Sequence, residues 1–149
     1  DAVAANRRKH GFDAVDDETN GFGPMWETRD DDASIGDVVV LATVVDDSDL
    51  DKRAITARTD EFRDVLIDRI DGQPGPTTPL GYVVFPVADP DPSIVDAAQS
   101  YTVARRRTNV FPLVYDCASE RLHRHEVPRL KGRGIYRRQA DDAGRLFDV

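Results

Sequence analysis

The stretch GDVVVLATVV, residues 36–45, constrains the fold of this chain more than any other feature. It is an almost unbroken run of apolar and β-branched side chains, without the alternation that marks a half-exposed strand. Such runs are typical of strands that are covered on both faces, as in parallel sheets flanked by helices. The stretch therefore predicts a buried strand over about residues 37–45 and favours the α/β class.

The residues that follow alternate between helix and strand patterns. Residues 50–71 and 92–107 carry apolar side chains at helical spacing, whereas residues 81–88 and 109–117 have the composition of apolar strands. Pro112 in the last of these predicts an edge, a bulge or a strand end, because proline donates no backbone hydrogen bond. This order predicts right-handed βαβ crossovers onto one sheet.

The C-terminal residues break this alternation. Residues 121–126 predict a strand that pairs back as an antiparallel hairpin, and KGRG at 131–134 predicts a loop. Residues 135–138 then predict a short strand, and residues 141–147 a final helix. We expect an α/β fold of a single domain, with a mixed sheet of about four to six strands, βαβ crossovers and a C-terminal antiparallel hairpin.

Residues 1–35 are rich in acids and turn formers. They predict a loop-rich acidic N-terminal arm that docks Phe22, Met25 and Trp26 onto the core. Residues 36–149 then form the single α/β domain, which is an ordinary domain size.

Aspartate and arginine dominate the charged residues: the acids are 23 Asp and 5 Glu, and the bases are 17 Arg and 3 Lys. This composition resembles that of proteins that work in concentrated salt, where screening makes the repulsion between like charges tolerable. It predicts a halophilic acidic protein. It also makes a group of aspartates weaker evidence for a metal site than it is in an ordinary chain.

Cysteine use and hydropathy indicate a compartment. The single cysteine, Cys117, allows no internal disulfide, which is typical of a reducing cytosol. The longest apolar run, VVVLATVV at residues 38–45, is far shorter than the roughly 20 residues that span a bilayer. We therefore expect a cytoplasmic protein that does not bind a membrane.

Charge is also unevenly distributed along the chain. Residues 1–100 carry a net charge of −13, residues 101–140 carry +7 and residues 141–149 carry −2, which sum to −8. Such a basic surplus predicts an anionic partner: a phosphate-bearing ligand, a nucleic acid or an acidic protein. The candidate anion-binding residues are Arg105, Arg106, Arg107, Lys131, Arg133, Arg137 and Arg138. A structural alternative is that the three consecutive arginines complement the dipole at the end of the helix predicted over 92–107.

Aspartates follow each predicted parallel strand, and Asp46, Asp47, Asp89 and Asp116 are candidate metal ligands. The carboxyl ends of parallel strands meet at one edge, where α/β proteins bind ligands. Carboxylates gathered there suit Mg²⁺. The competing explanation is that aspartate caps helices and is abundant in this chain.

No motif in the sequence indicates a particular enzymatic reaction. The phosphate-loop, dinucleotide-binding and nucleophile-elbow patterns are missing. His123 and His125 with Cys117 are too weak a set to predict a zinc site, and they are expected to be exposed hairpin residues. The leading prediction is a non-enzymatic binding module without a cofactor. The alternatives are a Mg²⁺-dependent phosphoryl-transfer or hydrolase enzyme, and a structural or homo-oligomerisation domain of a larger protein.

Overall fold

The structure, a computed structural model, describes residues 2–15, 22, 25–32, 35–46, 50–70, 77–125 and 133–146. In chain order its elements are α1 (Ala2–Lys9), β1 (Asp13–Val15), β2 (Met25–Asp32), β3 (Gly36–Val44), α2 (Lys52–Ile70), β4 (Thr78–Val87), α3 (Pro92–Gln99), β5 (Ala104–Arg105), β6 (Thr108–Asp116), β7 (Arg121–His123) and α4 (Arg133–Leu146). The strands within these ranges form one seven-stranded mixed sheet in the order β1-β2-β3-β4-β6-β5, and β7 also pairs with β6. The predicted α/β class is confirmed, with one strand more than expected.

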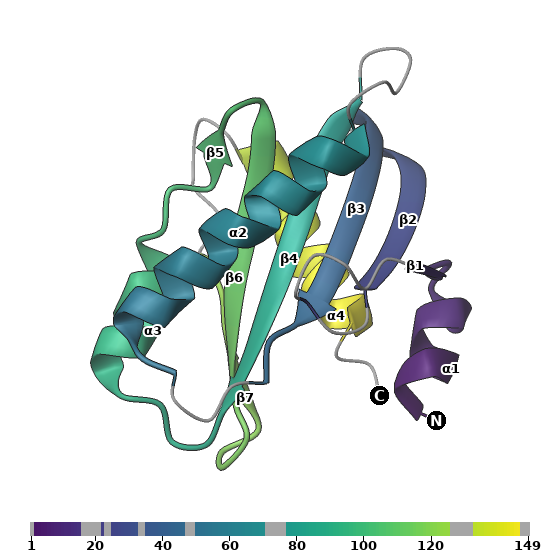
Figure 1. The fold of residues 1–149 in the computed structure, drawn as a ribbon. Helices are drawn as coiled ribbons and strands as arrows, with labels where there is room; N and C mark the ends of the chain where they lie inside the picture. Colours follow the sequence, from purple (N-terminus) through teal and green to yellow (C-terminus); the bar gives the residue numbers. More distant parts are fainter. Residues whose placement is uncertain are drawn as a thin grey trace.

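The middle of the sheet is parallel and covered on both faces. Strand β4 pairs in parallel with β3 on one side and with β6 on the other. Helices α2 and α3 connect these strands and lie over one face, while α4 lies over the other (Figure 1). Along β3, Leu41 packs in the core beneath α2, whereas Val40 and Ala42 pack in the core beneath α4. The apolar run therefore forms the doubly covered strand that its composition predicts.

Helix α2 approaches the sheet closely. Asp51 caps its start, since its carboxylate accepts a hydrogen bond of 2.8 Å from the backbone N–H of Ala54. Phe62 and Leu66 are buried against β4. A Cβ atom at Gly81 would lie 3.0 Å from the Phe62 ring, so a larger residue at this position in β4 would force that ring to shift by a few tenths of an ångström.

Helix α3 is shorter than predicted. Asp91 caps its start as expected, because its carboxylate accepts a hydrogen bond from a backbone N–H of the first turn. The helix ends at Gln99 with Ser100 as the C-cap, whereas the sequence predicts a helix over residues 92–107. The arginines at 105–107 therefore do not lie in the last turn of a helix, and the helix-dipole explanation for them is wrong.

The N-terminal residues are more regular than predicted. Residues 1–35 were expected to be loop-rich, but α1, β1 and β2 lie there, and β2 pairs antiparallel with β3 from Met25 to Asp32. The acidic end of β2, Asp30 to Asp32, has the composition of a turn, but Arg138 of α4 binds two of its carboxylates. Phe22 and Met25 are buried in the core, as predicted.

Helix α4 replaces the short strand and the final short helix that the sequence predicts over 135–138 and 141–147. Ala143 and Leu146 of this helix are buried in the core, but so are Arg138, Gln139 and Asp142, so polar side chains interrupt the apolar stripe of its inward face. Among the described helices, none is both long enough and apolar enough to cross a bilayer.

Candidate anion-binding site

Arg105, Arg106 and Arg107 form the connection between β5 and β6, and we call these three residues the arginine turn. Arg105 pairs with Thr108 across the hairpin, which leaves Arg106 and Arg107 as the two central residues. Their φ angles are +53° and +64°. Two-residue hairpin turns with both central residues at positive φ are of type I′, for which Asn-Gly is the preferred sequence.

This backbone conformation is unfavourable for arginine. A left-handed conformation costs an L-residue with a Cβ roughly 1–2 kcal/mol, and only Gly, Asn and Asp adopt it readily. All three side chains of the arginine turn are exposed, so burial of their apolar parts does not offset this cost. Strained residues of this kind are concentrated at functional sites.

A buried arginine of α2, Arg63, holds the arginine turn in place. One terminal nitrogen of its guanidinium donates to the carbonyl oxygens of Arg105 at 2.9 Å and Thr108 at 3.1 Å. The other donates to the carbonyl oxygens of Thr102 at 2.9 Å and Val103 at 2.8 Å. A helix continued to residue 107 would have satisfied the carbonyls of Thr102 and Val103, and Arg63 replaces those hydrogen bonds.

Two further contacts fasten the same segment to α2. The hydroxyl of Tyr101 donates to the carboxylate of Asp60 at 2.6 Å, and burial together with this bond raises the pKa of Tyr101. Arg106 forms an ion pair of 2.7 Å with Asp64, in which both side chains are mostly exposed. An exposed pair of this kind contributes at most about 1 kcal/mol, so it orients the turn more than it stabilises it.

Two hollows border the arginine turn. The first, which we call the α2 hollow, is about 650 Å³ and lies between α2 and the segment from Ala97 to Arg105. The second, the β6 hollow, is about 450 Å³ and lies where β4, β5 and β6 begin or end. Arg105 lines both hollows, and Arg107 lines the β6 hollow. In the part of the chain that the structure describes, neither of these two side chains forms a hydrogen bond or an ion pair.

The α2 hollow adds cations that sequence reasoning did not select. Lys52 and Arg53, from the first turn of α2, line it together with Arg105. Hydroxyl groups of Thr56, Ser100 and Thr102 also line the hollow. The only sequence signal for these residues is that they start a helix, and nothing in their local pattern indicates that the chain returns to them some fifty residues later.

The remaining predicted anion-binding residues lie elsewhere. Lys131 is outside the described residues. Arg133 and Arg137 belong to α4, which covers the opposite face of the sheet from α2, and Arg137 is exposed there. The arginine turn is thus brought together with Lys52 and Arg53 of α2.

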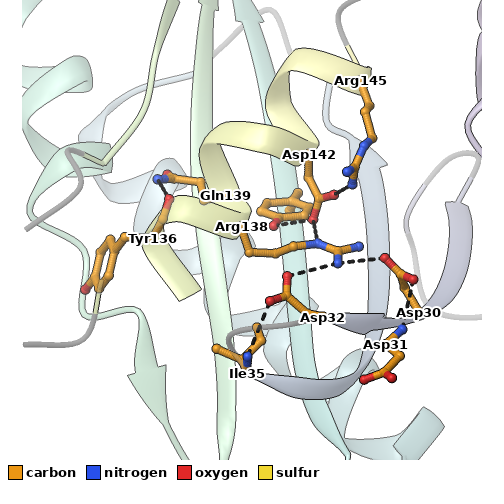
Figure 2. A network of polar contacts seen from close by, with 10 residues as sticks. Asp30, Asp31, Asp32, Ile35, Tyr136, Arg138, Gln139, Asp142 and Arg145 are labelled. Atoms are coloured by element: carbon orange, nitrogen blue, oxygen red, sulfur yellow. Dashed lines mark hydrogen bonds and ion pairs between the residues drawn. The ribbon is translucent and has the colours of Figure 1, made fainter. Parts of the chain in front are cut away.

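Arg138 is buried in a network of carboxylates (Figure 2). It donates to Asp142 at 2.9 Å, to Asp30 at 2.9 Å and to Asp32 at 3.3 Å. Burial alone would lower the pKa of Arg138, but the bonds to Asp142, Asp30 and Asp32 outweigh it and raise that pKa. Its guanidinium is engaged inside the protein, so we do not place Arg138 in the candidate site.

The strand-end aspartates have structural partners. Asp116 Oδ1 accepts a bond of 3.0 Å from the backbone N–H of Asp89, and its Oδ2 accepts one of 2.8 Å from the Ser119 hydroxyl. These bonds, first of all that from Ser119, lower the pKa of Asp116. Asp46 is exposed after β3, and Asp47 lies outside the described residues. Within the described ranges no three His, Cys, Asp or Glu side chains are grouped so as to hold a metal ion.

The histidines of the C-terminal hairpin differ from the prediction that both are exposed. His123 ends β7 and is partly buried, while His125 is buried, with its Nε2 atom 3.1 Å from the carbonyl oxygen of Tyr101. Cys117 is exposed. His125 is therefore engaged in the packing of the Tyr101 segment.

Comparisons of this chain with models of protein families, with curated proteins and with solved structures found no match. The arginine turn and the β6 hollow lie where β6 begins, and the α2 hollow extends from Arg105 along α2 to Lys52 and Arg53.

Proposed function

We propose that this protein is a binding module that holds phosphate-bearing ligands on the arginine turn. One observation carries the proposal: Arg106 and Arg107 occupy the two turn positions that most favour Asn and Gly. This turn places the guanidinium of Arg107 at the β6 hollow beside that of Arg105, while Arg106 pairs with Asp64. Guanidinium forks bind phosphate oxygens in pairs, and each such bond is stronger than a neutral one.

The salt-adapted composition agrees with this kind of site. At about 1 M salt the Debye length is about 3 Å, so diffuse attraction between charges is largely screened. A phosphate is then held mainly by direct hydrogen bonds from a fixed set of donors. Arg63 fixes the backbone from which these donors extend, because it binds carbonyl oxygens at both ends of the arginine turn from inside the protein.

The test is the double variant Arg106→Asn/Arg107→Gly. It places the preferred I′ residues in the turn, so we expect the free energy of unfolding to rise by about 1 kcal/mol. We expect affinity for a labelled oligonucleotide or for inorganic polyphosphate to fall at least about tenfold, which is the loss of one charged hydrogen bond or more. Urea unfolding and fluorescence anisotropy, both in molar KCl, measure the two effects.

Arg121→Gln is the matched control. Arg121 is exposed and pairs with Asp116, at the opposite end of β6 from the arginine turn. The strand advances eight residue steps from Thr108 to Asp116, which separates the two ends by about 26 Å at about 3.3 Å per residue. Equal loss of binding in this control would show diffuse attraction only. A double variant that binds as the natural chain does would refute the proposal.

A further inference from the structure

We infer that the ligand of the arginine turn is a single-stranded nucleic acid with amino-bearing bases, which lies across the α2 hollow and the β6 hollow. This inference rests on the proposed function and adds the class of ligand to it. Three features of the two hollows support it: their junction at Arg105, the difference in their charged linings, and the apolar floor of one of them.

The junction at Arg105 indicates a ligand with more than one anionic group. Arg105 lines both hollows, and each hollow has at least one further cation of its own. These are Lys52 and Arg53 in the α2 hollow and Arg107 in the β6 hollow. A single phosphate engages one such set, whereas a chain of linked phosphates engages both.

The lining of the α2 hollow indicates that part of the ligand is not phosphate. Ala57 and Ala97 line it beside Tyr101, so it offers an apolar surface to a flat ring. The carboxylate of Asp60 also lines it and would repel a bare phosphate. Carboxylates accept hydrogen bonds from exocyclic amino groups such as cytosine N4. A nucleotide suits this lining, because its phosphate can bind the cations, its base can lie on the apolar surface and an amino group of the base can donate to Asp60.

The β6 hollow has a different lining that suits the backbone of the same strand. Arg105, Arg107, Thr78 and Asn109 line it, together with the buried Thr108, and no carboxylate is among the described residues that line it. The Thr108 hydroxyl donates to the carbonyl oxygen of Arg105 and one Asn109 amide proton to that of Pro79, so the two arginines and Thr78 are the main donors that face a ligand. Hydroxyl, amide and guanidinium donors without an acid bind phosphates irrespective of base. A flexible single strand can place its unstacked bases in a hollow, whereas the bases of a duplex are stacked inside it.

The experiment compares oligo(dC) with oligo(dT), each of about ten nucleotides, which is within the site size of single-strand-binding domains. The two differ in the group that Asp60 recognises, since cytosine presents an amino donor where thymine presents an oxygen acceptor. By anisotropy in molar KCl at neutral pH, we expect the natural chain to bind oligo(dC) about fivefold or more tightly than oligo(dT).

Two variants separate the hollows. In Asp60→Asn the side-chain oxygen still accepts from the Tyr101 hydroxyl, and the amide tolerates either base, so the ratio between oligo(dC) and oligo(dT) should fall to about one. Arg107→Gln removes a cation from the β6 hollow alone. It should weaken oligo(dC) at least about fivefold while leaving the affinity for cytidine monophosphate unchanged. Arg121→Gln again serves as the control that changes neither.

The outcomes distinguish this inference from the proposed function. Polyphosphate or duplex DNA that competes as well as oligo(dC), or equal binding of oligo(dC) and oligo(dT), would overturn the inference and leave the phosphate site standing. No binding of any of these probes by the folded chain would overturn both.

Discussion

At the residue scale, His125 shows how one buried side chain makes stability depend on pH. Its Nε2 atom carries the proton and donates to the carbonyl oxygen of Tyr101, while Nδ1 is buried with no partner in the described part of the chain. The edges of Phe111 and the ring of Tyr136 lie around it. Burial therefore lowers the pKa of His125, because the charged form has no acceptor for a proton on Nδ1.

The sign of the pH effect follows from linkage. The unfolded chain takes up the proton near pH 6.5, whereas the folded chain does so only at a lower pH, so stability is complete above pH 6.5 and declines as the pH falls below it. We expect urea unfolding to give a decreasing free energy from about pH 6.5 to pH 5. His125→Gln should flatten this decline, whereas His123→Gln should retain it. A decline that is the same in both variants would contradict the assignment.

At the element scale, a network of buried charges attaches α4 to the sheet. Asp142 is fully buried and accepts hydrogen bonds from Tyr82 of β4 at 2.7 Å, from Arg138 at 2.9 Å and from Arg145 at 2.7 Å. Burial and the neighbouring Asp142 raise the pKa of the Tyr82 hydroxyl well above its usual range. The network joins α4 to β4 through Tyr82 and to β2 through Asp30 and Asp32, so it fixes the rotation of the helix against the sheet.

We predict that Arg138→Met and Asp142→Leu each lower the free energy of unfolding by about 1.5–3 kcal/mol, since each removes a charged hydrogen bond from a buried group. The cost is limited because Asp142 keeps Arg145, and Arg138 keeps Asp30 and Asp32. The double variant should cost clearly less than the sum of the two, because it removes both charges of the pair. Urea unfolding of the four proteins measures this coupling. Arg137→Met, an exposed neighbour in α4, should change stability by less than about 0.5 kcal/mol. Strictly additive costs would show that Arg138 and Asp142 do not act as a unit.

A second contact, from α1, completes the attachment of α4. Asn6 donates to the carbonyl oxygen of Arg145 at 2.9 Å, and Arg7 donates to that of Leu146 at 2.7 Å. These carbonyls belong to the last turn of α4, where they have no partner within the helix. Burial lowers the pKa of Arg7. The two terminal helices are thus joined through backbone groups that the end of α4 leaves open.

At the scale of the whole molecule, a net charge of −8 on 149 residues opposes folding in dilute buffer. We predict that the free energy of unfolding rises as KCl is increased to about 1 M, where the Debye length falls to about 3 Å. Denaturation by urea at each salt concentration measures this rise. Stability that stays constant or falls with KCl would contradict the prediction of a salt-adapted protein.

A charge-reduced variant provides the control for this effect. Asp31, Asp68 and Asp96 are exposed, and none of their carboxylates is in a hydrogen bond or an ion pair with another described residue. The triple change of these residues to Asn should stabilise the chain in dilute buffer. It should also reduce the gain from KCl, because fewer like charges are left to screen.

The elements that could be predicted are those in which apolar side chains occupy the buried positions or a capping residue marks the start of a helix. The run at 38–45 has to be covered on both faces, and Asp91 followed by Pro92 starts α3 as its capping chemistry requires. Where polar side chains occupy buried positions the prediction failed. Arg63, Arg138 and Asp142 have the composition of a solvated helix face, yet each is nearly or fully buried.

The sequence by itself determined the α/β class, the parallel centre of the sheet and the presence of three adjacent arginines. These depend on side-chain periodicity and backbone chemistry within a few residues. Only the tertiary structure decided that α3 ends before the arginines, that Arg138 is enclosed by carboxylates, and that Lys52 and Arg53 line a hollow with Arg105. Each of these depends on contacts between residues far apart in the chain, and the free energy of such contacts outweighs local preference.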